Sequence, residues 1–134
     1  MKQAKYFVVG ILFIAASSVC LAQNTGVSRT EVIKADVSVP GREAVVSRVE
    51  IAPGGKLGWH THAGDEISYV ESGELTLLVA GKPEQKIAAG GGFVVQAGAV
   101  HSARNDGTLP VQLITVHVVD KGKPLATPAA PPAE

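Results

Sequence analysis

Apolar and polar residues alternate along most of the chain between residues 28 and 120. Side chains at every second position of a strand share one face, so this alternation predicts strands. Gly- and Pro-rich segments interrupt the alternation roughly every 8 to 12 residues, and no stretch shows a convincing helical periodicity. The pattern therefore predicts an all-β sandwich or barrel.

The predicted strands can be placed by their apolar faces. These faces comprise Ile33, Ala35, Val37 and Val39; Val45, Val49 and Ile51; Leu75, Leu77 and Val79; and Phe93 and Val95. Residues 111–119 form the last and most apolar strand. We expect the turn Pro53-Gly54-Gly55 to end the second of these strands, because Pro and Gly favour turns.

The two ends of the chain do not share this pattern. Residues 1–22 combine Lys2 and Lys5 with an apolar run and end in Cys20-Leu21-Ala22, which predicts a secretory signal peptide cut after Ala22. An uncleaved anchor and a lipoprotein attached through Cys20 are the alternatives. With cleavage, we expect a periplasmic or secreted protein without a stable membrane anchor.

The last segment, residues 121–134, contains four of the eight prolines and is rich in alanine. Such a composition does not bury a core, so we expect an extended or disordered, flexible tail. Residues 23–120 then form one barrel domain.

Composition and charge exclude several classes of protein. Twelve Lys and Arg balance twelve Asp and Glu, so no basic surface for nucleic acid is expected. Apolar residues make up 46% and charged residues 18% of the chain, as in folded domains. A single cysteine excludes a disulfide framework and a cysteine-based zinc cluster.

The segment of residues 54–73, GGKLGWHTHAGDEISYVESG, carries a candidate metal site. His60 and His62 are two positions apart on a predicted strand, so both imidazoles point to the same side. The turn Ala63-Gly64-Asp65 then reverses the chain, and Glu66 opens the next strand beside them. Two imidazoles and a carboxylate on one face are suited to a divalent metal ion. The alternative is a pair of surface histidines near a turn.

A second segment, residues 90–105, reads GGGFVVQAGAVHSARN and places His101 on another predicted strand. The spacing of His60, His62 and Glu66 between flanking glycines resembles the first motif of the cupin superfamily. The spacing of Gly90, Gln96-x-Gly98, His101 and Asn105 resembles the second. Gln96 stands where the family usually has proline, which bears on the rigidity of that turn and not on the ligands.

The resemblance implies a double-stranded β-helix, the jelly-roll barrel of cupins. It also implies one divalent metal ion inside the barrel, held by His60, His62, Glu66 and His101. Iron, manganese, nickel, copper and zinc all suit these ligands. Three neutral imidazoles and one carboxylate leave a net charge of +1 on such a site and favour an anionic oxygen donor as ligand.

The function expected from this resemblance is that of an exported metal-binding cupin. One candidate activity is the oxidation of a small enolic or phenolic compound by dioxygen, with Glu66 as a candidate base. The alternatives are a non-catalytic module that binds a small molecule or the metal, and a structural domain that the metal stabilises.

Five further residues are of interest besides the four candidate ligands. His117 belongs to neither motif, and we expect it to be structural or to line the cavity. Trp59 and Tyr69 should point away from the metal and are candidates for a homodimer contact. Arg48 and Arg104 are candidates for binding an anionic substrate, with solvated surface arginines as the alternative.

Overall fold

The structure is a computed structural model, and it describes residues 23–133. The predicted signal peptide, residues 1–22, lies outside the described residues, as does Glu134. The regular elements within the described range are all β-strands, which confirms the predicted fold class. No helix in this part of the chain is long and apolar enough to cross a membrane.

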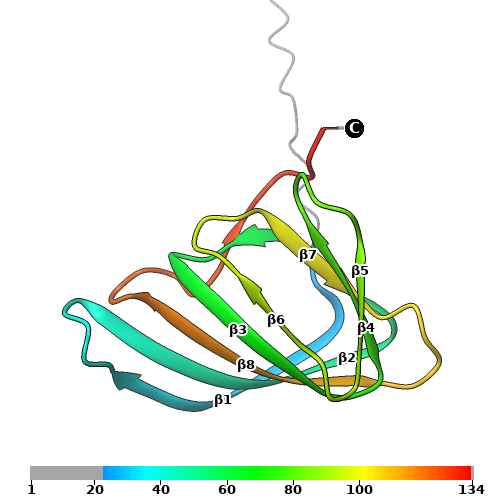
Figure 1. Ribbon diagram of the computed structural model, residues 1–134, viewed down its shortest axis with the longest axis horizontal. Helices are drawn as coiled ribbons and strands as arrows, with labels where there is room; N and C mark the ends of the chain where they lie inside the picture. The colour runs from blue at the N-terminus through cyan, green and yellow to red at the C-terminus, as the bar shows by residue number, and fades with distance from the viewer. Residues whose placement is uncertain (1–22, 134) are drawn as a thin grey trace, which may run out of the picture.

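The strands pair in antiparallel fashion and close into a barrel (Figure 1). They are β1 (Thr25–Asp36), β2 (Arg42–Thr61), β3 (Gly64–Ser72), β4 (Glu74–Val79), β5 (Gln85–Ala88), β6 (Gly92–Val95), β7 (His101–Arg104), β8 (Val111–Asp120) and β9 (Thr127–Pro128). Their order in the sheet is β5-β4-β7-β2-β8-β3-β6, and both β1 and β9 pair with β2.

Strand β2 joins the two layers of the barrel because it is long enough to belong to both. Residues 42–51 pair with β8 on one side, and β1 pairs along the other. The end of β2 pairs instead with β7 and β9. The prediction that Pro53-Gly54-Gly55 ends this strand is wrong: β2 continues through it, and Gly54, with φ at 73°, adopts the left-handed conformation there.

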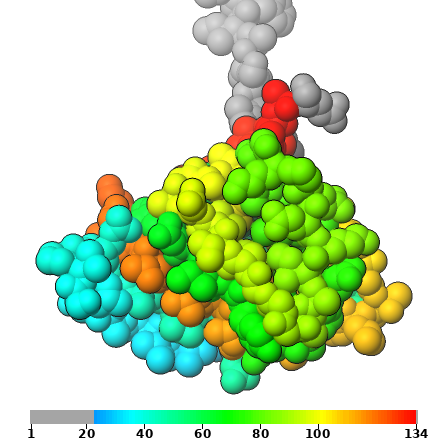
Figure 2. Space-filling model, viewed as in Figure 1, coloured from blue at the N-terminus to red at the C-terminus, as the bar shows by residue number. Residues whose placement is uncertain are grey.

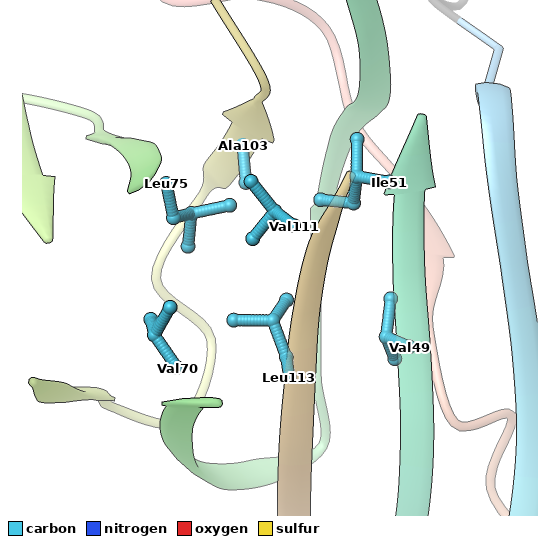
Figure 3. Packing of buried hydrophobic residues seen from close by; sticks show 7 residues of the cluster. All are labelled: Val49, Ile51, Val70, Leu75, Ala103, Val111 and Leu113. Atoms are coloured by element: carbon cyan, nitrogen blue, oxygen red, sulfur yellow. The ribbon is translucent and has the colours of Figure 1, made fainter. Parts of the chain in front are cut away.

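The hydrophobic core lies between the two layers. Its main cluster comes from five strands and comprises Val49, Ile51, Val70, Leu75, Ala103, Val111 and Leu113 (Figure 3). These side chains point toward one another across the barrel. Most of them occupy the alternating positions predicted from the sequence, so burial of every second residue holds the layers together.

The first strand departs from the sequence prediction. β1 ends at Asp36, so Val37 and Val39 follow it as a connection rather than continue it. Ile33 is 54% exposed. Among the described strands β1 pairs only with β2, so it forms an edge of its layer and its outer face is open.

The tail contributes a short strand that the expectation of a flexible segment did not include. Pro128 and Thr127 of β9 lie opposite His60 and Thr61 of β2. The Ala129 N–H donates a hydrogen bond of 2.8 Å to the carbonyl of Trp59. A proline is tolerated here because β9 is an edge strand. Figure 2 shows the C-terminal residues, in red, at one end of the molecule.

Candidate metal centre

The structure brings the four sequence-predicted ligands together. His60 lies near the end of β2, His62 just after it, Glu66 in β3 and His101 at the start of β7. His60 and His101 are direct partners across the β2–β7 ladder. One possible ligand atom from each of the four residues lies within 4.8 Å of all the others, and all four residues are buried.

Main-chain carbonyl groups fix the orientation of the three imidazoles. Each ring donates its Nδ1 hydrogen to one carbonyl oxygen: His60 to Gly58 (2.7 Å), His101 to Ala99 (2.9 Å) and His62 to Leu125 (2.5 Å). A carbonyl oxygen only accepts, so Nδ1 carries the hydrogen and the Nε2 lone pair is left for the cluster. Histidine ligands of metals are held in this way.

The Glu66 carboxylate lies at the centre of the cluster. Its Oε2 is 3.1 Å from His62 Nε2 and 3.2 Å from His101 Nε2, and its Oε1 accepts a 2.7 Å hydrogen bond from Ser68. Burial raises the pKa of Glu66, but the polar groups around the carboxylate, with Ser68 as a hydrogen-bond donor, outweigh it and hold the pKa well below its ordinary value. Glu66 is therefore ionised.

The donor atoms fit a divalent cation. An imidazole protonated at Nδ1 presents a lone pair at Nε2, which repels a carboxylate oxygen unless positive charge lies between them. Donors that share a metal at about 2.1 Å lie about 3 Å apart when they are at right angles, close to the spacing around Glu66. Burial lowers the pKa of His60 to about 4, so its imidazole is neutral and can bind a metal at pH 7.

His117 adjoins the cluster but is held differently. It is completely buried in β8, opposite Glu66 in the β3–β8 ladder. Its Nε2 is 3.3 Å from His62 Nε2 and 3.5 Å from Glu66 Oε2. Its Nδ1 has no hydrogen-bond partner among the described residues, in contrast to the three ligand histidines. We therefore assign His117 to the positioning of Glu66.

A small cavity of about 20 Å³, partly open to solvent, lies beside the cluster. His60, Glu66 and His101 line it, together with mostly apolar side chains of the core. Arg29 and Thr115 supply the remaining polar groups of its wall. A pocket of this kind, apolar with a few polar groups, is typical of small-molecule sites.

The two arginines singled out from the sequence do not line this cavity. Arg104 pairs on the surface with Glu84 (2.6 Å) and Asp106 (2.8 Å), and the hydrogen bonds that it donates to these carboxylates raise its pKa. Arg48 is exposed. Arg29 was not singled out from the sequence. It lies two positions after Val27 in the same strand, and Val27 packs against the core, so this spacing was a signal that Arg29 faces inward.

The chain belongs to the Cupin domain family, whose model matches residues 47–117, more than half of its length. No curated protein matches the sequence. The structure is similar to a cupin-like protein from Thermotoga maritima MSB8, with 18% identity, a TM-score of 0.65 and coverage of 88% of this chain and 90% of that one. The shared fold is the jelly-roll barrel that the sequence resemblance implied.

Two further structures share this fold. A cupin superfamily protein from Desulfitobacterium hafniense DCB-2 is 15% identical, with a TM-score of 0.60 and coverage of 74% of this chain and 83% of that one. The DMSP lyase DddQ from Ruegeria pomeroyi DSS-3 is 21% identical, with a TM-score of 0.57. The match covers 65% of this chain but only 42% of the lyase.

A first prediction separates the ligands from His117. His101→Ala removes one of four donors, so we expect its affinity for zinc to fall by more than about 100-fold. His117→Ala removes only a group that contacts a ligand, so we expect a loss of about tenfold. Competition with a chromophoric chelator measures both affinities. Equal losses would make His117 a fifth ligand.

A second prediction concerns the tail. Deleting residues 124–134 removes the Leu125 carbonyl that orients His62, so we expect zinc affinity to fall by about tenfold or more. Deleting only residues 130–134 keeps Leu125 and β9 and should leave the affinity unchanged. The same chelator competition measures both. Unaltered affinity after the longer deletion would contradict a positioning role for the tail.

Proposed function

We propose that the chain is an exported, metal-dependent oxidoreductase that oxidises a small enolic or phenolic compound with dioxygen. The observation that carries this proposal is the position of the buried donor cluster in the wall of a largely apolar cavity. The proposed export to the periplasm or the outside rests on the sequence of residues 1–22 alone.

A bound divalent ion supplies Lewis acidity and, where it is redox-active, electron exchange with dioxygen. The side chains around the ion determine which compounds can bind next to it. Three neutral imidazoles and one carboxylate leave a net positive charge at the centre, which favours a deprotonated enol or phenol over a neutral ligand. The apolar wall excludes water and holds the hydrocarbon part of the compound.

Glu66 serves this proposal as a ligand. Its pKa lies below the ordinary value, and a divalent ion bound to the carboxylate would stabilise the ionised form further, so Glu66 would take up a proton poorly. The low pKa therefore favours the role of ligand over the expected second role as a base.

A non-catalytic binding module is the second candidate, and one observation favours it. Besides the cluster residues and Arg29, no described residue that lines the cavity is titratable. A binder needs no acid or base, whereas an enzyme of this kind would have to move protons through the cluster or the ligand itself.

Metal content and oxygen uptake together test the proposed function. We expect the purified full-length chain to contain about one iron, manganese, copper or nickel ion, as measured by mass spectrometry, and His101→Ala to lose it. A panel of enols and phenols should then show metal-dependent oxygen uptake. Stoichiometric zinc with ligand binding but no oxygen uptake would favour the binding module, and absence of any metal would contradict the oxidoreductase and leave a module that binds a small molecule.

The outer face of one layer offers a surface for the expected homodimer. A row of apolar side chains crosses five paired strands there, and its members are successive cross-strand partners. They are Val94 (β6), Ile67 (β3), Val116 (β8), Val46 (β2) and Ile33 (β1). Ile67 is 48% and Val94 59% exposed. A contiguous exposed apolar face of this kind is typical of an interaction site.

Tyr69, 51% exposed, lies beside this row on β3, whereas Trp59 lies on β2 where it pairs with β7 and β9. Strands β2 and β3 do not pair, so Trp59 and Tyr69 are not neighbours across one pair of strands and do not form one contact surface in that way. Neighbouring strands lie about 4.8 Å apart, so two or three rows of side chains across five strands cover a contact area of about 400 Å² on each copy. That area suits a weak dimer of two such faces.

The dimer is tested by Ile67→Lys, which places a charge in the middle of the row. We expect the unaltered chain to dimerise with rising concentration in sedimentation velocity and the variant to stay monomeric. Leu109→Lys, at a residue 71% exposed in the connection between β7 and β8, is the matched control and should dimerise normally. A monomeric unaltered chain at every concentration would contradict the dimer.

A further inference from the structure

Arg29 is a cationic side chain that reaches into the barrel from its edge strand. In β1 it lies opposite Val49 of β2, whose side chain belongs to the core, so both point to the inner side of the layer. Its Nη1 donates a 3.3 Å hydrogen bond to Thr115 Oγ1, and Thr115 is only 2% exposed. The guanidinium therefore forms part of the cavity wall, on which His60 and Glu66 also lie.

No carboxylate pairs with this guanidinium within the part of the chain that the structure describes. Arg42 and Arg104, in contrast, form ion pairs with Asp120 and Glu84. Burial lowers the pKa of Arg29 and the charge of Glu66 opposes that shift, but an arginine stays protonated under such conditions. Arg29 thus holds a positive charge in the wall with most of its five N–H donors unused by other residues.

A row of hydroxyl groups lies beside it. Ser68, Thr115 and Ser47 are successive partners across β3, β8 and β2, and all three are almost completely buried. Ser68 donates to Glu66, which leaves Thr115 as the hydroxyl shared between Arg29 and the cavity. Because Thr115 Oγ1 accepts from Arg29, its own hydrogen is free to point to an anion.

The charges of the cavity are unbalanced once a divalent ion is bound. The ion and its four protein ligands carry a net charge of +1, and Arg29 adds another positive charge in the same wall. A neutral enol or phenol would leave both positive charges without an anionic partner, although solvent also reaches the exposed Arg29. A ligand with two anionic oxygen groups would compensate both.

We propose that Arg29 and Thr115 bind a carboxylate of the cavity's ligand, so that this ligand carries a carboxylate at one end and a metal-binding oxygen group at the other. This inference rests on the metal site of the proposed function and names the substrate class for it. A guanidinium suits the role because its parallel N–H groups match the two oxygens of a carboxylate.

The dimensions of the cavity limit the ligand to short carbon chains. Thr115 is two positions from His117 along β8, and both side chains are buried on the same face, about 7 Å apart along the strand. His117 in turn contacts the cluster at Glu66. The cavity is small, about 20 Å³, and partly open to solvent, so a small oxo or hydroxy acid suits it better than a sugar chain or a lipid.

Calorimetric titration of the zinc-loaded full-length chain with succinate tests the inference. We expect succinate to bind and the neutral diol of the same carbon skeleton not to bind. Arg29→Gln should weaken succinate binding by at least about tenfold, and Arg29→Lys, which keeps the charge but not the paired donors, by less. Arg48→Gln removes the same charge from an exposed position of β2 and should bind succinate like the unaltered chain.

Zinc affinity, measured by chelator competition, distinguishes failure of this inference from failure of the metal site. It should be unchanged or higher in Arg29→Gln, because a nearby cation has been removed. If zinc binds but Arg29→Gln and the unaltered chain bind succinate equally, the carboxylate site is wrong and the metal site stands. Tighter binding of inorganic phosphate than of succinate would also overturn the carboxylate assignment. If the unaltered chain does not bind zinc, the proposed function fails and this inference with it.

Discussion

The burial of the Glu66 carboxylate is the constraint on which the rest of the structure depends. Removing a carboxylate from water is costly unless positive charge and hydrogen-bond donors replace the water. Here Ser68 donates a hydrogen bond, and a cation held between Glu66, His62 and His101 would supply the positive charge; these residues lie on or beside three different strands. The cluster therefore forms only when all these strands have the correct register. A cation shared by the donors would also hold the two layers of the barrel together.

The same requirement accounts for the role of main-chain carbonyls. A histidine can serve the cluster only when its Nδ1 is satisfied elsewhere, and for His60 and His101 the carbonyl two residues upstream supplies that acceptor. His62 has no such local acceptor and takes the carbonyl of Leu125 instead. A Pro- and Ala-rich segment can supply this contact because the acceptor is backbone and needs no particular side chain.

The sequence was sufficient for the metal ligands but not for the groups that hold them. His60, His62 and Glu66 lie close together in the sequence, and their spacing carries the motif that predicted them, although β2 and β3 do not pair. Arg29 lines the cavity because β1 pairs with β2, and Leu125 reaches His62 beside β9, which also pairs with β2. A main-chain carbonyl leaves no signal in the sequence. Alternation also does not tell the inner face from the outer one, so the apolar positions of β1 could not be recognised as exposed.

The layer formed by β1, β2, β8, β3 and β6 shows why that ambiguity matters for function. Near the metal cluster its inner face carries polar side chains such as Ser47 and Thr115, while Ile67 and Ile33 lie on its outer face. Further along the strands, the inner face becomes apolar again at Val49 and Leu113, which belong to the core. The inner face thus gives up apolar burial beside the candidate metal centre, and a partner covering the outer face would restore part of it. The proposed ligand site and the proposed dimer surface would then lie on opposite faces of the same strands.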